Sequence, residues 1–235
     1  MPDDTLLIEA RDLLPEAIDR RRRLHQRPEV GLDLPFTQDE VLAALDGLPL
    51  GIRTGEATSS VVATLDGARP GPTILLRGDM DALPMPEDTG LDFASEVDLA
   101  MHACGHDAHV AMLAGAARLL AARRDQLAGR VAFMFQPGEE GHHGARYMIE
   151  EGLLDGEGAP EAAFAIHTTP NMPAGALGTR PGPLLASADV LHIDVRGRGG
   201  HASMPQDALD PVPVACEVVQ AIQTMVTRRV NVFDH

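Results

Sequence analysis

Nine consecutive residues, 101–109, hold a thiol, three imidazoles and a carboxylate in the sequence MHACGHDAH. Cys and His side chains bind borderline-soft divalent metals, and Gly105 permits a tight turn that lets Cys104 and His106 reach one centre. An apolar helix is expected over residues 110–120, and its N-terminal dipole would favour the Cys104 thiolate, the form that binds metal. A helix start with spare histidines is the alternative interpretation. Because this segment combines three His with one of only two Cys in the chain, we favour the metal site.

A pair of carboxylates, Glu139 and Glu140, follows an apolar run at residues 130–135. Adjacent side chains in a loop point in different directions, so one carboxylate can bind a metal while the other faces the substrate. The second can then act as a base toward water, whose pKa a bound metal lowers towards about 7. A solvated acidic loop is the alternative, but the Pro-Gly pair before the two Glu residues favours a shaped loop.

The elements that must position these residues are predicted from apolar periodicity. Strands are expected at residues 59–65, 73–77, 130–135 and 162–166, and helices at residues 4–26, 37–45, 110–120, 145–151 and 211–228. The alternation predicts an α/β fold with a mixed, mostly parallel sheet and helices on both faces. The second helix is expected to begin at Thr37, which has capping-box spacing to Glu40.

In sheets of this kind, ligands bind at the carboxyl ends of the strands. Here those ends carry Asp79 and Asp81, the Glu139–Glu140 pair, and His167. The 104–106 turn opens a helix in the same succession of elements. We therefore expect these metal-type residues to converge on one edge of one sheet, which is stronger support for a metal site than any single motif.

Composition limits the class of protein. The 235 residues suffice for one large domain or one and a half smaller ones, and 19 basic against 35 acidic residues give a net charge of −16. This charge disfavours nucleic acid and anionic membranes as partners. No signal peptide and no membrane-spanning apolar run are visible, so we expect a cytoplasmic protein. Two distant Cys make no disulfide framework.

The pattern changes after Pro183. Residues 188–196 alternate apolar and polar side chains, which is typical of a half-buried strand in a sheet with helices on one face. A Gly-rich loop ending at His201 follows. An imidazole there could stabilise the oxyanion of a tetrahedral intermediate, although a single His after such a turn is more often an ordinary loop residue.

Five segments together carry a family resemblance: RGDMDALPMPE, MHACGHDAHVAMLAGAA, FQPGEEGHHGARYMIEEGLL, AIHTTPNMPAG and GRGGHASMPQDALDPV. In this order they resemble the successive motifs of the M20 metallopeptidase and amidohydrolase family, from about residue 24 to the end of the sequence. The branch they resemble most holds hippurate hydrolases, N-acyl-L-amino acid amidohydrolases and auxin-conjugate hydrolases.

The resemblance implies a zinc-exopeptidase-like catalytic domain over residues 1–183 and the start of an α+β ferredoxin-like lid and dimerisation domain over residues 184–235. It implies an enzyme that cleaves the amide bond of N-acyl amino acids or similar small amides with two divalent metal ions, Mn²⁺, Zn²⁺ or Co²⁺. It also implies that the full-length form is a homodimer.

The resemblance also implies roles for individual site residues. The family's general base matches Glu139, and the His that helps to bind the substrate carbonyl matches His201. Other branches have a His-x-Asp motif where this chain has Asp79 and Asp81, so we interpret Asp81 as a residue that orients ligands and do not assign Asp79 as a ligand. A structural turn is an equal alternative for both. The family's metal ligands match Cys104, His106, Glu140 and His167.

The sequence also departs from the family. No residue up to His235 matches the last metal-ligand His, and the lid would hold one strand, one helix and a strand beginning at residues 230–233. We therefore expect either a fragment of a longer enzyme or a short homologue that binds metal without turnover. A dipeptidase or carboxypeptidase with the same metal chemistry, and a structural zinc protein, are the further alternatives.

Overall fold

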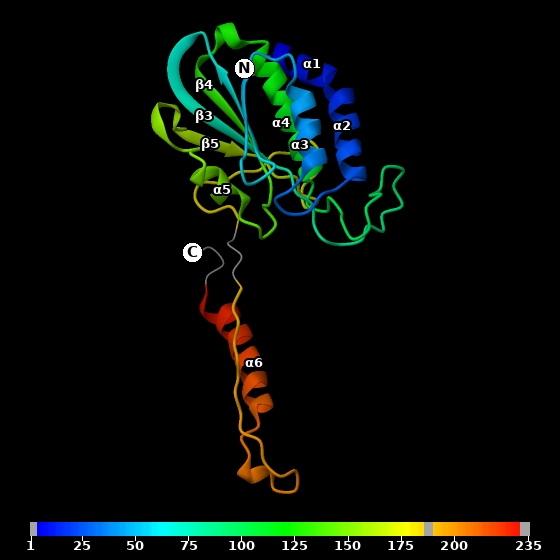
Figure 1. The fold of residues 1–235 in the computed structure, drawn as a ribbon, viewed down its shortest axis with the longest axis vertical. Coiled ribbons are helices and arrows are strands. Elements are labelled where there is room, and N and C mark those ends of the chain that lie inside the picture. Colours follow the sequence, from blue (N-terminus) through cyan, green and yellow to red (C-terminus); the bar gives the residue numbers. More distant parts are fainter. Residues whose placement is uncertain (1–3, 186–189, 231–235) are drawn as a thin grey trace. The chain divides into compact units, whose positions relative to one another are not determined.

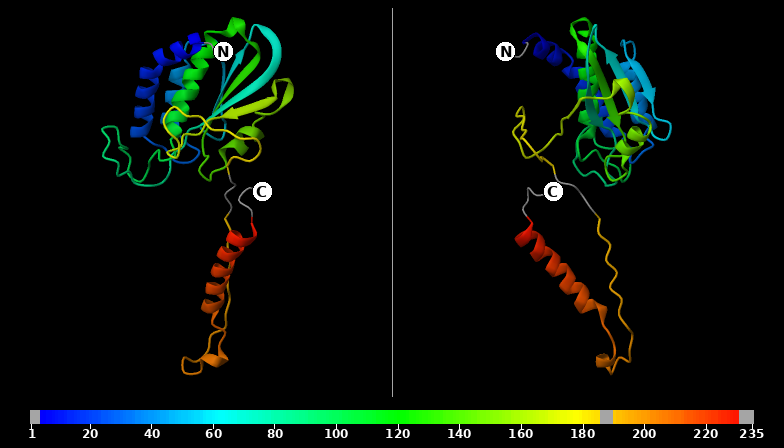
Figure 2. Two further views of the ribbon diagram at one scale, coloured as in Figure 1. Left: turned by 180° about the vertical axis from the view of Figure 1, so that it is seen from behind. Right: turned by 90° about the vertical axis from the view of Figure 1, so that its left-hand side faces the viewer.

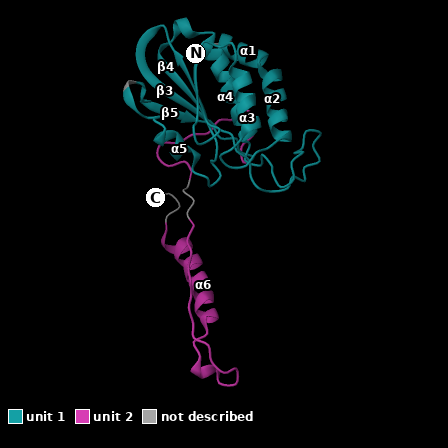
Figure 3. Cartoon of the chain, viewed as in Figure 1, with its two compact units in different colours: residues 1–170 teal, residues 171–235 magenta. Residues whose placement is uncertain are grey.

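The computed structural model describes residues 4–185 and 190–230. The chain forms two compact units, and the division falls between Pro170 and Asn171 (Figure 3). The domain boundary predicted between residues 183 and 184 stays a prediction.

The first unit is built on a five-stranded sheet of order β1-β2-β4-β3-β5. β2 pairs antiparallel with β1 and β4, whereas β3 pairs in parallel with β4 and β5. The mixed α/β sheet is confirmed, and its parallel part is the part that carries the candidate site. The strands are β1 (Gly51–Thr54), β2 (Val61–Asp66), β3 (Arg69–Asp79), β4 (Ala128–Gln136) and β5 (Ala162–Ala165).

The helices lie where they were predicted, except that one predicted helix is divided into two. The helix expected over residues 4–26 is two helices that meet at Leu13, because Pro15 lacks an N–H and is tolerated only in a first helical turn. The α-helices are α1 (Asp4–Asp12), α2 (Leu14–Gln26), α3 (Pro35–Leu45), α4 (His106–Ala121), α5 (Gly144–Glu150) and α6 (Pro211–Arg229). Short 3-10 helices are η1 (Arg124–Gln126), η2 (Gly156–Gly158) and η3 (Pro205–Asp207).

The predicted capping box of α3 is wrong. The helix begins at Pro35, so Thr37 already lies inside it. The carboxylate of Glu29 accepts the backbone N–H groups of Phe36 at 3.1 Å and Thr37 at 2.8 Å. A side chain from the preceding loop therefore satisfies the free donors of the first turn.

Helices α2, α3 and α4 contribute to the main core on one face of the sheet (Figures 1 and 2). Side chains alternate across β4, so Phe133 and Phe135 enter this core while Met134 enters a smaller cluster. That cluster includes Met148 of α5, which covers part of the opposite face. The first turns of α4 are buried at His106, Asp107, His109 and Val110. Packing therefore fixes the start of this helix.

The second unit contains α6, η3 and an isolated bridge between Arg198 and Leu209. The strand predicted over residues 188–196 is not seen at residues 190–196, which pair with no strand among the described residues; residues 188 and 189 lie outside the described part. The strand predicted at 230–233 lies outside it beyond Val230, which ends α6. None of the helices within 4–185 and 190–230 combines the length and apolarity needed to cross a bilayer.

Candidate metal centre

The parallel strands bring the predicted residues to one edge of the sheet. Asp79, the last residue of β3, lies opposite Gln136, the last residue of β4. The loop with Glu139 and Glu140 follows β4, and His167 follows β5. Convergence at this edge is what the succession of strands and helices predicted.

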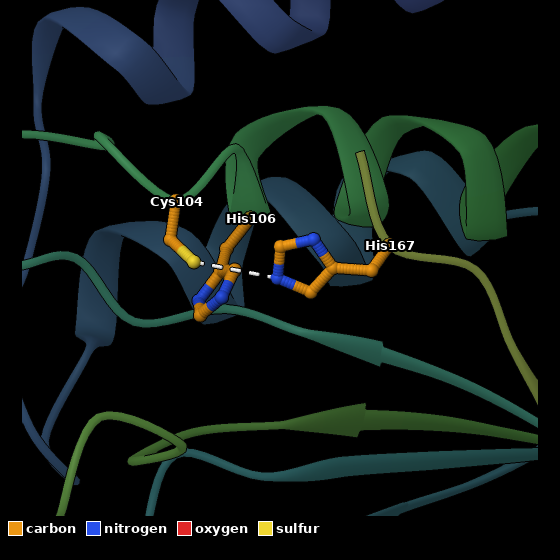
Figure 4. A group of neighbouring side chains, drawn as sticks. All are labelled: Cys104, His106 and His167. Atoms are coloured by element: carbon orange, nitrogen blue, oxygen red, sulfur yellow. Dashed lines mark hydrogen bonds between the residues drawn. The ribbon is translucent and has the colours of Figure 1, made fainter. Parts of the chain in front are cut away.

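Three side chains gather where α4 begins. Cys104 lies just before the helix, His106 is its first residue, and His167 comes from the segment after β5 (Figure 4). The Cys104 Sγ and His167 Nε2 atoms are 3.3 Å apart, and one ligand atom of each of the three residues lies within 4.8 Å of the others. Gly105 adopts a φ of 82°, a conformation that glycine takes readily, and so permits the turn between the first two residues.

His106 also belongs to a second group, with Glu139 and Glu140. Its Nε2 atom is 4.0 Å from a carboxylate oxygen of each. The Nδ1–H donates to the backbone carbonyl of Asp81 at 2.8 Å, which leaves Nε2 with its lone pair free for a ligand role. Among the described residues this buried Nε2 has no hydrogen-bond partner. A buried nitrogen that faces a thiol, an imidazole and two carboxylates fits a divalent cation.

Asp81 fixes the acidic loop. Its two carboxylate oxygens accept the backbone N–H groups of Glu139 at 2.8 Å and Glu140 at 2.9 Å. Burial raises the pKa of Asp81, but hydrogen bonds from His106 and from the two backbone groups outweigh burial and lower it. The residue is thus a charged anchor, in accord with its predicted orienting role.

Both carboxylate oxygens of Asp79 have close polar partners. One accepts the Nδ1–H of His109 at 2.6 Å, and the other pairs with Arg77 at 2.6 Å and lies 3.5 Å from His106 Nε2. Burial raises the pKa of Asp79, yet the His109 hydrogen bond and the charges of His106 and Arg77 lower it to about 2. Asp79, His106 and His109 form a third group with metal-type atoms, but the first and last are already hydrogen-bonded to each other.

The surroundings of Cys104 do not favour the thiolate that the sequence led us to expect. Burial raises the pKa of the thiol to about 12, and the carboxylates of Glu140, Glu139 and Asp79 act in the same direction. Burial and these carboxylates thus raise the pKa of the thiol, in the direction opposite to the one expected from the helix end. A divalent cation at the site would supply the positive charge that favours deprotonation.

Sequence reasoning missed a buried network behind the centre. Asp107, next to His106, accepts Arg21 Nε at 2.7 Å and His25 Nδ1 at 2.7 Å, which ties α4 to α2. Burial lowers the pKa of His102 to about 4, so this imidazole is neutral. The sequence signal for Asp107 is its place in the metal motif; none was available for His25, which lies 82 residues away.

His201 belongs to the second unit. Its Nδ1 atom accepts the backbone N–H of Ser203 at 3.2 Å and lies 2.8 Å from the Ser203 hydroxyl, which orients the exposed ring. The surrounding hollow is lined by the segments 197–202 and 208–211 and by Pro205. The role of His201 toward a substrate stays a prediction.

Comparison with known proteins gives concordant matches. The model of peptidase family M20/M25/M40 matches residues 75–232. The chain is 40% identical to N-acetylcysteine deacetylase of Bacillus subtilis, over 91% of this chain and 56% of that protein. It is 38% identical to thermostable carboxypeptidase 1 of Saccharolobus solfataricus, over 95% of this chain and 57% of that protein. The chain thus spans little more than half the length of these curated relatives.

A solved structure from Bacillus subtilis, a dinuclear metal-binding peptidase of the M20 family, superimposes with a TM-score of 0.69 and 40% sequence identity. The superposition covers 74% of this chain and 48% of that one. The sheet and helices described above therefore share the fold of that peptidase.

Proposed function

Since the chain belongs to peptidase family M20/M25/M40, we propose that it carries the metal centre of an amidohydrolase that cleaves N-acyl amino acids or similar small amides. The observation that carries the proposal is the buried His106 Nε2, without a hydrogen-bond partner among the described residues, between the Cys104–His167 pair and the two carboxylates. The similarity to an N-acetylcysteine deacetylase supports an acyl amino acid as substrate.

Cys104, His106, Glu140 and His167 would hold two divalent ions, for which Zn²⁺, Mn²⁺ and Co²⁺ suit the thiol, imidazole and carboxylate donors. The ions supply Lewis acidity that polarises the amide carbonyl and makes water a better nucleophile at neutral pH. Every further step is assigned to side chains of this chain.

Glu139 acts as the general base. Its side chain is 42% exposed whereas that of Glu140 is 22% exposed, so Glu139 is the carboxylate that reaches incoming water and substrate. It accepts a proton from the attacking water and delivers that proton to the leaving amine. His201 donates a hydrogen bond to the oxyanion that forms at the carbonyl oxygen.

A peptidase that cleaves dipeptides or removes C-terminal residues is the second candidate, favoured by the similarity to a carboxypeptidase. A panel of N-acetyl amino acids, N-benzoylglycine and dipeptides separates the two. After dialysis against a chelator and return of Mn²⁺, Zn²⁺ or Co²⁺, we expect metal-dependent release of the free amino acid from the N-acyl compounds. Faster cleavage of dipeptides would favour the peptidase, and metal binding without turnover the inactive homologue.

The proposal includes a homodimer of the full-length form and a location in the cytoplasm. Support for the dimer comes from apolar side chains exposed on α6, among them Val212, Val219 and Met225. Light scattering of the purified full-length form measures its mass: twice the mass of one chain supports the dimer, and a monomer contradicts it.

A further inference from the structure

A chain of polar contacts crosses the sheet edge beneath the centre. Arg77 donates to the Gln136 side chain at 2.9 Å and pairs with Asp79 at 2.6 Å. Asp79 accepts the Nδ1–H of His109, and His109 Nε2 accepts the backbone N–H of Thr168 at 3.0 Å. These contacts link the end of β4, from which the acidic loop starts, to the segment that follows β5.

The partners of His109 determine which of its ring nitrogens donates a hydrogen bond and which accepts one. A carboxylate at Nδ1 requires a proton on that nitrogen, and a backbone N–H at Nε2 requires a lone pair there. The hydrogen bonds therefore hold the ring in one tautomer, and His109 is only 3% exposed. A metal at His109 would have to displace one of these partners.

Thr168, which is held by His109, in turn orients the side chain of His167. Its carbonyl oxygen accepts the Nδ1–H of His167 at 2.6 Å, which leaves His167 Nε2 directed at Cys104 Sγ, 3.3 Å away. The Thr168 hydroxyl also lies 3.4 Å from the Cys104 carbonyl oxygen. One residue, Thr168, thus determines where the imidazole of His167 meets the thiol.

We propose that His109, anchored by Asp79, is a positioning residue that holds Thr168 and thereby sets His167 beside Cys104 for metal binding. The inference rests on the proposed function, because it concerns the metal site formed by that pair. It assigns His109 no contact with substrate or metal. Residues that orient metal ligands by hydrogen bonds typically change metal affinity by about 10–100-fold when replaced.

The test measures Co²⁺ binding through the thiolate-to-cobalt charge-transfer absorption. A Cys216→Ser background leaves Cys104 as the single thiol, since the chain has two Cys. His109→Phe keeps a planar ring without nitrogen atoms, and we expect its Co²⁺ dissociation constant to rise about 10–100-fold. His109→Gln can still accept the Thr168 N–H with its amide oxygen, so part of the affinity should return. Glu150→Gln, in an exposed i,i+4 pair on α5, is the control that should bind like the parent.

The outcomes separate the two proposals. No Cys104-dependent band in the parent would refute the metal centre itself. A normal band in the parent together with unchanged affinity in His109→Phe would overturn the positioning role, as would a glutamine variant no better than phenylalanine. If His109→Phe does not fold, Asp79→Asn weakens the same anchor without altering the ring. We expect weaker Co²⁺ binding there too, and parental affinity would count against the inference.

Discussion

The buried carboxylate of Asp81 accepts the backbone N–H of Glu140 at 2.9 Å, so the acid at the end of one strand fixes the loop that follows another. The adjacent backbone N–H of Glu139 donates to the other oxygen of the same carboxylate. The candidate base and the candidate ligand therefore take their relative positions from one side chain.

Replacing Asp81 by Asn should disturb the positions of both Glu139 and Glu140. An amide offers one acceptor oxygen and turns a donor toward the second N–H, which leaves a buried donor unpaired at a cost of about 1–3 kcal/mol. We expect a lower free energy of unfolding and weaker metal binding, measured by denaturant titration and calorimetry. Unchanged values in both would show that the loop does not depend on Asp81.

Glu139→Gln should separate catalysis from metal binding. The amide keeps the size of the side chain but cannot accept a proton, and loss of a general base lowers kcat by about 10²–10⁴-fold. Metal content, measured by mass spectrometry, should stay at the parental value. Glu150→Gln, in an exposed i,i+4 pair on α5, is the matched control. Parental turnover in the Glu139 variant would refute its assignment as base.

Gly105→Ala should strain the turn between Cys104 and His106. The φ of 82° costs an alanine about 1–2 kcal/mol, and its Cβ would collide with the Thr168 hydroxyl. The double variant with Thr168→Ala removes the collision but not the backbone strain. We therefore expect it to recover part of the lost unfolding free energy, and a double variant as unstable as the single one would contradict the predicted contact.

The His25–Asp107 pair should make stability fall as pH rises above the unfolded-state pKa of His25. The hydrogen bond to Asp107 raises the pKa of His25 despite the opposing effect of burial. A raised folded-state pKa means that this stabilisation is complete below the unfolded value of about 6.5 and is lost as pH rises through the folded value. Denaturant unfolding between acidic and alkaline pH should show this decline in the parent and a weaker one in His25→Gln. Identical profiles would refute it.

Glu29→Ala should destabilise α3 without touching the metal centre. Its carboxylate caps two backbone donors, and loss of such a cap costs about 0.5–2 kcal/mol. Glu29→Gln retains one acceptor oxygen, so its stability should lie between those of the parent and of Glu29→Ala. Thermal unfolding measures the effect, and Co²⁺ affinity should not change. A stable alanine variant would mean that water replaces the cap without loss.

Local patterns predicted the parts of this fold that have local causes. Apolar runs marked β4 and β5 to within two residues at their ends, and the parallel order of strands brought Asp79, Glu140 and His167 to one edge. β1 was not predicted, because its four exposed residues carry no alternation and the strand exists by pairing with β2.

The contacts behind the site could not be predicted from the sequence. His25 and Asp107 are 82 residues apart and each looks ordinary in its own segment. The raised pKa of Cys104 depends on carboxylates that the chain brings close only on folding. His109 belongs to the motif, yet one of its partners is the backbone N–H of Thr168, and such a group leaves no trace in residue identity.

The parallel pairing of β3 with β4 also sets the order of events when the chain folds. Arg77 and Gln136 meet across 59 residues of sequence, so the loop between them must close before the two halves of the centre can approach. Non-local pairings of this kind form slowly, whereas a helix such as α4 forms quickly. Early in refolding, Cys104 and His106 at the start of α4 would thus be close together before Glu140 and His167 join them. The full metal affinity would be reached only when folding is complete.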